Sequence, residues 1–537
     1  MIQKDCGMKQ LVPIFLFLLI GSACTQKQPA TKQPNIVFIL SDDHAYQAIS
    51  AYHYPIGALA PTPNIDRLAD EGMIFNRAFV TNSLCGPSRA TIITGKFNHI
   101  NGFMRNGDLF DPDQPTFPKM LQAAGYQTAV VGKWHLKSLP QGFNYWCVLP
   151  GQGHYYNPNF IKQPGDTVRI QGYVTDLIGD MALDWLKNRD PEKPFLLMFQ
   201  HKAPHREWLP PVRYLDRYHN TKFPLPDNFF DDHAGMGQAA REAEMLVSEH
   251  MGLSNDNKID PEIVTETGHK PFLAWYPKAY RNNLARMTPE QRAEWDKVYQ
   301  PINEAFRNNP PEGDSLAKWK YQRYMEDYLA CIRAVDDNVG RILDYLKEND
   351  LDKNTIVVYT SDQGFYLGEH GWFDKRFIYE ESFRTPLLIK YPEMIKPGTK
   401  NNDLVQNIDF APTFLELAHA EIPEDLQGVS LLPLFRGNHP DNWRTSLYYH
   451  YYEFPGIHMA KRHYGIRTDR YKLIHFYNDV DEWELYDLKK DPHEMHNVIG
   501  DPDYEMIKKD LTHQLDSLIR MYRDPLEPVV TQSESGK

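Results

Sequence analysis

The chain has 537 residues, 42% of them hydrophobic and 24% charged, and its formal net charge is −13. This composition is that of a globular protein, and the acidic balance argues against nucleic acid as a partner. Because a chain of 537 residues is longer than a single hydrophobic core usually supports, we expect a large domain and a smaller one.

The beginning of the chain predicts export. Residues 8–24 (MKQLVPIFLFLLIGSAC) combine a basic start, an apolar run and a small-residue exit, which is the pattern of a secretory signal. Gly21 to Cys24 resemble a bacterial lipoprotein box, although Gly21 departs from the usual Leu and leaves plain cleavage open. We therefore expect a signal peptide over 1–24 and a polar tether over 25–34. The protein is expected in the periplasm or cell envelope, with a lipid anchor on Cys24 as its link to the membrane.

The first predicted strand ends in two carboxylates. Asn35 to Leu40 form a continuous apolar, β-branched run that indicates a buried parallel strand. Asp42 and Asp43 follow it, at the carboxyl end where open α/β sheets place their ligands. A turn or helix cap is the alternative role for such a pair. The next predicted elements are a short helix (63–69) and a pair of strands (72–75 and 78–80).

The stretch from Cys85 to Gly95, CGPSRATIITG, predicts a loop that leads into a short helix. Pro87 suits the first turn of such a helix, and Gly95 suits its exit. Cys85 then lies just before a helix N-terminus, where free N–H groups favour a bound anion. Arg89, one turn on, could reach back toward Cys85 or toward that anion. From spacing alone, a buried cysteine beside a helix cap is an equal alternative.

Two further strands are expected to carry polar groups to the same edge of the sheet. The strand over 127–132 runs into Lys133 and His135, which project on one face if the segment is extended. The buried strand over 194–200 ends in His201 and His205, which are candidates for acid–base and anion-binding roles. Helices are expected before these strands, over 116–121 and 176–187.

The second half of the chain predicts an insertion, another strand exit and a small sheet. Residues 206–320 are charged and punctuated by proline, so we expect a helical and loop insertion that shapes a substrate cleft. A long amphipathic helix over 319–346 leads to a buried strand over 355–360 that ends in Asp362 and Gln363. The remaining predicted elements are strands over 384–389, 447–452, 464–468, 471–476 and 484–488 and a helix over 503–522.

These elements predict an α/β fold with a large mixed, mostly parallel sheet flanked by helices, and with a smaller C-terminal antiparallel sheet plus helix. We expect a main domain over 35–440, a C-terminal α+β subdomain over 441–525 and a tail over 526–537. Polar groups at four strand exits then meet along one carboxyl edge. Three carboxylates and an amide oxygen among them are hard ligands, which suit Ca²⁺ or Mg²⁺.

The run C-x-P-S-R followed by T-G, which starts at Cys85, resembles the signature of the sulfatase family, in which the cysteine is oxidised to formylglycine. The resemblance extends over nearly the whole mature chain and implies the fold of the alkaline phosphatase superfamily. It implies one divalent cation, usually Ca²⁺ and less often Mg²⁺. The implied metal ligands are Asp42, Asp43, Asp362, Gln363 and the modified Cys85. Gln363 stands where many members have Asn. The implied catalytic residues are Cys85, Arg89, Lys133, His135, His205 and Lys375.

The family chemistry explains these residue types. A sulfate ester is anionic and repels a nucleophile, so cations must neutralise it. Hydrated formylglycine offers an oxygen nucleophile and a second hydroxyl whose collapse expels sulfate, while protonated His205 donates to the leaving alkoxide. A formylglycine-generating maturase is therefore an implied partner.

Three longer segments, 137–146, 150–158 and 223–230, resemble bacterial N-acetylglucosamine-6-O-sulfatases. They imply a sulfated glycan as substrate, with a 6-O-sulfated N-acetylglucosamine from heparan, keratan or mucin. Sugar contacts are expected from the insertion and the C-terminal sheet. The candidate substrate-binding residues are His201, His450, Glu453 and His463.

Three alternatives stay open. The chain could prefer another sulfated sugar. A phosphatase or phosphonate monoester hydrolase of the same superfamily is expected to carry a Thr or Ser nucleophile and more metal ligands. A glycan-binding lipoprotein without activity is expected to have lost part of the catalytic set, whereas here every position is filled.

Overall fold

The computed structural model describes residues 1–2 and 33–526. The predicted signal peptide and nearly all of the predicted tether lie outside the described residues, as does most of the predicted tail. The described residues from Gln33 onward belong to one compact unit. In the described part of the chain, each helix is either too short or too polar to cross a bilayer.

A ten-stranded mixed sheet forms the centre of this unit, and five successive strands of the sheet, β9, β1, β8, β4 and β5, are parallel. β1 (Asn35–Ser41) pairs with β8 (Phe195–Gln200) on one side and β9 (Thr355–Ser361) on the other, and β4 (Gln127–Lys133) pairs with β8. All residues of β1, β8 and β9 are buried, as expected for parallel strands covered on both faces. The predicted fold class is confirmed.

The edges of the large sheet are mixed in direction. On one side lie β12 (Leu387–Lys390), β2 (Met73–Phe75) and β13 (Thr399–Asn401), and on the other lie β5 (Tyr145–Leu149), β6 (Asn159–Lys162) and β7 (Asp166–Arg169). The predicted pairing of 72–75 with 78–80 is wrong. β2 joins the large sheet, whereas β3 (Ala78–Phe79) pairs with β14 (Val405–Gln406) in a separate small sheet.

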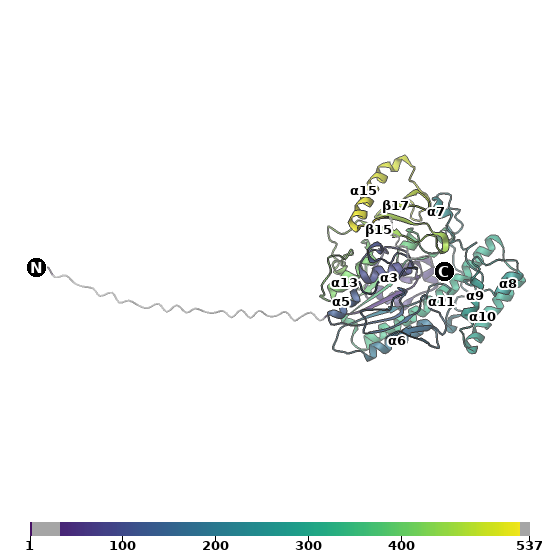
Figure 1. The fold of residues 1–537 in the computed structure, drawn as a ribbon, viewed down its shortest axis with the longest axis horizontal. Coiled ribbons are helices and arrows are strands. Elements are labelled where there is room, and N and C mark those ends of the chain that lie inside the picture. The colour runs from purple at the N-terminus through teal and green to yellow at the C-terminus, as the bar shows by residue number, and fades with distance from the viewer. Residues whose placement is uncertain (3–32, 527–537) are drawn as a thin grey trace. The chain divides into compact units, whose positions relative to one another are not determined.

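Helices cover the two faces of the sheet (Figure 1). Val37 and Ile39 of β1 pack with residues of α6 (Val174–Asn188) and α11 (Gly313–Glu348). Ile36 and Phe38 pack on the other face, where the helices are α3 (Cys85–Thr94), α5 (Phe117–Ala123) and α13 (Phe410–Leu417). The alternation of side chains along β1 therefore places one half of its apolar surface in each layer. The other short helices of the main domain are α1 (Pro55–Leu59), α2 (Pro63–Asp70), α4 (Asn98–Asn101), α12 (Glu380–Phe383) and α14 (Leu432–Phe435).

The predicted insertion is a set of loops and helices. Its helices are α7 (Gln238–Arg241), α8 (Pro261–Glu266), α9 (Tyr276–Leu284) and α10 (Pro289–Asn308), and Figure 1 shows the last three grouped beside α11. α10 begins with a capping box between Thr288 and Gln291. The Tyr299 hydroxyl of α10 donates to Asp327 of α11 at 2.7 Å, which ties the insertion to the main domain.

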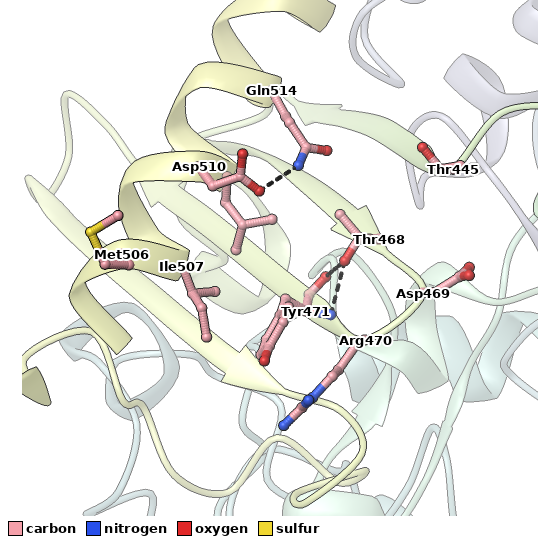
Figure 2. Close-up of a pocket in the computed structure, with 10 residues that line it drawn as sticks. Thr445, Thr468, Asp469, Arg470, Tyr471, Met506, Ile507, Asp510 and Gln514 are labelled. Carbon is pink, nitrogen blue, oxygen red and sulfur yellow. Dashed lines mark hydrogen bonds between the residues drawn. The ribbon is translucent and has the colours of Figure 1, made fainter. Parts of the chain in front are cut away.

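The C-terminal segment forms the predicted antiparallel sheet with a helix packed on it. Its strands are β15 (Ser446–Tyr451), β16 (His463–Thr468), β17 (Tyr471–Phe476) and β18 (Glu482–Asp487), and its helix is α15 (Glu505–Tyr522). A groove of about 390 Å³ lies between α15 and the β16–β17 turn. Figure 2 shows Tyr471 and Met506 on its walls. None of the residues that line this groove belongs to the predicted catalytic set.

Candidate active site

Three carboxylates meet at the carboxyl ends of two adjacent strands. Asp42 and Asp43 follow β1 and Asp362 follows β9, and all three side chains are fully buried. One oxygen from each lies within 4.8 Å of the others. Asp43 adopts φ +64°, and its amide donates to Asp362 Oδ1 at 3.1 Å, which fixes the two strand ends together. The structure thus brings together the carboxylates that the sequence predicts for a metal site.

Each carboxylate faces a cation. Lys133 Nζ pairs with Asp42, and Lys375 Nζ lies 2.7 Å from Asp43 Oδ2. Burial alone would raise the pKa of Asp42, but Lys133 and the other nearby cations hold that pKa well below its usual range. Burial and the Asp42 charge raise the pKa of Asp43 to about 6 and that of Asp362 to about 8, against the opposing effect of their own cationic partners. The raised pKa values of Asp43 and Asp362 reflect the close approach of three carboxyl groups in a buried site.

Cys85 is the first residue of α3 and lies beside these carboxylates. Leu84 is the N-cap, and the helix ends at Gly95, which has φ +64°. The Cys85 sulfur lies 3.9 Å from Asp43 Oδ1 and 3.9 Å from Gln363 Nε2. Burial and the Asp42 charge raise the pKa of the Cys85 thiol well above its ordinary value. The unmodified thiol is therefore protonated at neutral pH and a poor nucleophile.

Arg89 points to the carboxylates and away from the role suggested by its spacing to Cys85. Its Nε and Nη2 donate to Asp362 Oδ2 at 3.0 and 2.9 Å, and Nη1 donates to the carbonyl of Lys133 at 2.8 Å. The guanidinium therefore links the exits of β9 and β4 across β1 and β8. These hydrogen bonds position the carboxylate cluster.

The donor set fits a hard divalent cation. Asp42 Oδ1 and Gln363 Oε1 are buried and have no hydrogen-bond partner. The amide of Gln363 points its nitrogen at Asp43 Oδ1, and a half-turn of the same group would present its oxygen there instead. Three carboxylates and an amide oxygen are the ligands that Ca²⁺ prefers, so the residues present match the predicted site.

A cavity of about 530 Å³ opens over Cys85, within the range of about 300–1,000 Å³ typical of ligand pockets. Among the predicted catalytic residues, His205 and Lys375 line it together with Cys85. The His205 Nε2 atom lies 3.8 Å from Asp43 Oδ2. The walls of the cavity come from Asn106, loops within 150–154 and 202–207, insertion residues Asn255 and Trp275, and segments 374–376 and 453–458.

One wall is a charged network that the sequence patterns do not predict. His458 Nε2 lies 3.3 Å from Asp374 Oδ2 and 3.0 Å from Arg206 Nη1, and Asp374 also pairs with Arg376. Asp374 and Arg376 flank the predicted Lys375, and Arg206 follows the predicted His205. These three residues could therefore have been found from the sequence, because each is adjacent to a predicted site residue. His458 lies on a loop with no such neighbour.

The predicted sugar contacts are only partly placed at the pocket. Glu453 lines the pocket, and its carboxylate accepts a hydrogen bond from the backbone N–H of Asn106 at 3.1 Å. The prediction needs correction for three buried histidines that do not line the pocket: His201, His450 and His463. His450 binds Asp524 at 2.7 Å, and His463 accepts from the amide of Ile378 at 3.1 Å.

His135 and His201 follow strands but differ from the expected geometry. β4 ends at Lys133, and His135 has φ +58°, so the two side chains do not share one face of an extended segment. His135 is half-buried, and burial together with the Lys133 charge lowers its pKa. His201 packs against Phe199 at 4.3 Å between ring centroids, and burial lowers its pKa to about 3. A buried neutral ring of this kind fills space.

Comparison with known proteins gives two family matches. The sulfatase model matches residues 34–420, and the model of the C-terminal region of N-sulphoglucosamine sulphohydrolase matches residues 368–521. N-acetylglucosamine-6-O-sulfatase of Bacteroides thetaiotaomicron is 49% identical over 97% of this chain and 92% of its own. Human N-acetylglucosamine-6-sulfatase is 26% identical over 82% of this chain and 71% of its own.

Solved structures agree with these matches. A protein in complex with its substrate D-glucosamine-2-N,6-O-disulfate superposes with a TM-score of 0.87 at 48% identity, over 92% of this chain and 99% of its own. A phosphonate monoester hydrolase from Silicibacter pomeroyi reaches a TM-score of 0.63 at 21% identity, over 91% of this chain and 95% of its own, and shares the fold. The buried carboxylates, the cysteine at the start of α3 and the match over 34–420 agree, and the chain belongs to the sulfatase family.

Proposed function

We propose that this protein hydrolyses the 6-O-sulfate ester of N-acetylglucosamine and related glucosamine units in glycans. The observation that carries the proposal is the 49% identity to a relative named N-acetylglucosamine-6-O-sulfatase, over 97% of this chain. The solved complex with a 6-O-sulfated glucosamine supports the same substrate class. The pocket over Cys85 supplies cationic groups for an anionic ester.

Asp42, Asp43, Asp362 and Gln363 would hold a divalent cation, for which Ca²⁺ is our choice over Mg²⁺. Cys85 would be converted to formylglycine by a maturase. The bound cation and the formylglycine would supply charge neutralisation and an oxygen nucleophile in place of the protonated thiol.

Two lysines of the chain direct positive charge toward the ester. Lys133 pairs with Asp42 and Lys375 pairs with Asp43, so buried carboxylates hold both ammonium groups in place. Lys375 also lines the pocket. Fixed cations of this kind stabilise charge that develops in the transition state without reorganising.

His205 is placed to donate a proton to the departing sugar oxygen. Its Nδ1 donates to the carbonyl of Arg206 at 2.5 Å, which leaves Nε2 directed toward the carboxylate side of the site. Burial and the Lys133 charge lower the pKa of His205 in the free protein. An anionic ester beside the ring would oppose that effect, so protonation is coupled to substrate binding.

The test is hydrolysis by protein produced together with a formylglycine-generating enzyme. The panel contains 6-, 3-, 2- and N-sulfated glucosamine sugars and a sugar phosphate monoester. We expect sulfate release from the 6-O-sulfated N-acetylglucosamine and none after Cys85→Ala. The mass of the peptide that contains residue 85 reports the modification independently. Preferred turnover of another sulfated position or of the phosphate ester would replace the proposed substrate.

We also propose export and lipid attachment at Cys24, on the sequence pattern alone. Growth with a labelled fatty acid should place the label in the wild-type protein and not in Cys24→Ala. Release of unlabelled wild-type protein into the soluble periplasm would instead favour plain cleavage.

A further inference from the structure

The rim of the active-site pocket carries two exposed apolar side chains. Trp275 is 49% exposed and Ile457 is 50% exposed, and both line the pocket over Cys85. Among the lining residues that the structure describes, these are the large apolar ones with exposed side chains, and most of the others are polar or charged. Ligand pockets typically combine aromatic and apolar side chains with a small number of polar groups.

The indole of Trp275 is held in place although it is exposed. Trp275 immediately precedes α9, and its ring meets that of the buried Tyr276 edge-on at 90° with 4.6 Å between centroids. The Tyr276 hydroxyl accepts from Arg206 Nη2 at 2.9 Å, and Arg206 is in turn paired with Asp256. A chain of contacts therefore links the half-exposed indole to the charged pocket wall.

Ile457 lies on the same rim and directly precedes His458 of the charged pocket wall. His458 is 1% exposed and bound to Asp374, whereas the side chain of Ile457 beside it is half-exposed. Asn255, also in the pocket lining, is 2% exposed, and its Oδ1 has no hydrogen-bond partner. The pocket thus offers an apolar surface at its mouth.

We propose that Trp275 and Ile457 form a subsite for the sugar joined to the sulfated glucosamine, with the indole against the C–H face of that pyranose. The sulfated unit must reach the buried Cys85, so the next sugar of the chain meets the half-exposed rim. This inference rests on the proposed function and extends it from a monosaccharide to an oligosaccharide.

The test compares two substrates on the same variants. One is free 6-sulfated N-acetylglucosamine, and the other is the same sugar joined through its C1 to a second hexose. We expect Trp275→Ala to lower kcat/KM for the disaccharide by about three- to tenfold more than for the monosaccharide. Trp275→Phe should keep most of the disaccharide preference. Phe230→Ala is the matched control, because Phe230 is 50% exposed in the same insertion but does not line the pocket.

Equal loss on both substrates would overturn the subsite and assign Trp275 to the sulfated unit itself, for example to its N-acetyl group. Retention of the full disaccharide preference in Trp275→Ala would also overturn it. If the wild type cleaves neither substrate, the proposed function fails, and disaccharide binding to Cys85→Ala, measured by calorimetry with and without Trp275→Ala, still decides the subsite. Weaker binding in the double variant supports it, and equal or absent binding overturns it.

Discussion

Arg89 donates from both Nε and Nη2 to a single oxygen of Asp362, at 3.0 and 2.9 Å. This contact joins the helix that begins at Cys85 to the exit of β9. It also places a buried positive charge between two carboxylates, because Asp42 Oδ1 lies 3.7 Å from Nη2. The position of Asp362 therefore depends on a planar, multiply donating cation.

Arg89→Lys should lower sulfatase activity by about 10²-fold while the protein remains folded, because an ammonium cannot reproduce the forked contacts. Steady-state kinetics on the 6-sulfated sugar and circular dichroism measure the two effects. Arg341→Lys is the matched control, since Arg341 pairs with Asp180 on the exposed surface. Wild-type activity in Arg89→Lys would show that Asp362 is positioned without the guanidinium.

Removal of the metal should destabilise the protein. A chelator is expected to lower the Tm, and added Ca²⁺ to restore it, because a cation that binds only the folded state stabilises it by mass action. In Gln363→Ala the Ca²⁺ concentration for half-maximal recovery should rise at least about tenfold. Gln238→Ala, which removes a surface amide bound to Glu242, should leave that concentration unchanged. An unchanged midpoint in Gln363→Ala would remove Gln363 from the ligand set.

Asp524 should make the C-terminal region sensitive to acid. Burial raises its pKa, but the opposing effect of His450, with hydrogen bonds from His450 and His99, is larger and holds that pKa well below the ordinary 3.8. A carboxyl with a depressed pKa in the folded state stabilises it fully above the unfolded pKa and loses that contribution as pH falls below it. Asp524→Asn should cost about 2 kcal/mol in the free energy of unfolding at pH 7.

Urea unfolding of wild type and Asp524→Asn between pH 7 and pH 3 tests this sign. The difference between them should shrink as pH drops below about 4. Asp510→Asn on the exposed face of α15 should cost little at any pH. A difference that is constant with pH would mean that the carboxylate charge is not what stabilises this region.

Gly132 allows β4 and β8 to approach closely beside Lys133. It has φ +101°, and a Cβ built there would lie 1.8 Å from the carbonyl oxygen of Gln200. Gly125 has a similar φ of +95° with open space around it. Gly125→Ala should therefore cost about 1–3 kcal/mol from backbone strain alone. Gly132→Ala should cost clearly more or prevent folding, as measured by urea unfolding, and equal costs would show that the strands can separate.

The sequence patterns predict the carboxylate cluster because each member directly follows a recognisable apolar run. Asp42, Asp43 and Asp362 are examples, since β1 and β9 read as buried strands. The strands β6 and β7 could not be predicted in this way, because residues of β7 are mostly exposed and show no apolar alternation.

The histidines of the C-terminal sheet show a second limit. Alternation along β15 says that His450 and Tyr449 face opposite sides, but not which side meets the pocket. Both sides are covered here, so His450 became buried against Asp524 instead. The pocket wall of Arg206, Asp374 and His458 comes from three distant segments, and only the folded chain brings them within hydrogen-bond reach.

The place of β1 in the sheet determines how late in synthesis this strand can be covered on both sides. This strand is completed at residue 41, yet its neighbours are β8, which ends at residue 200, and β9, which ends at residue 361. A chain emerging from the ribosome or from a secretion channel must therefore keep one of its most apolar segments uncovered until two-thirds of its length is available. Such a chain depends on chaperone protection early, and a fragment that stops before residue 355 lacks the strand that carries Asp362 to Asp42.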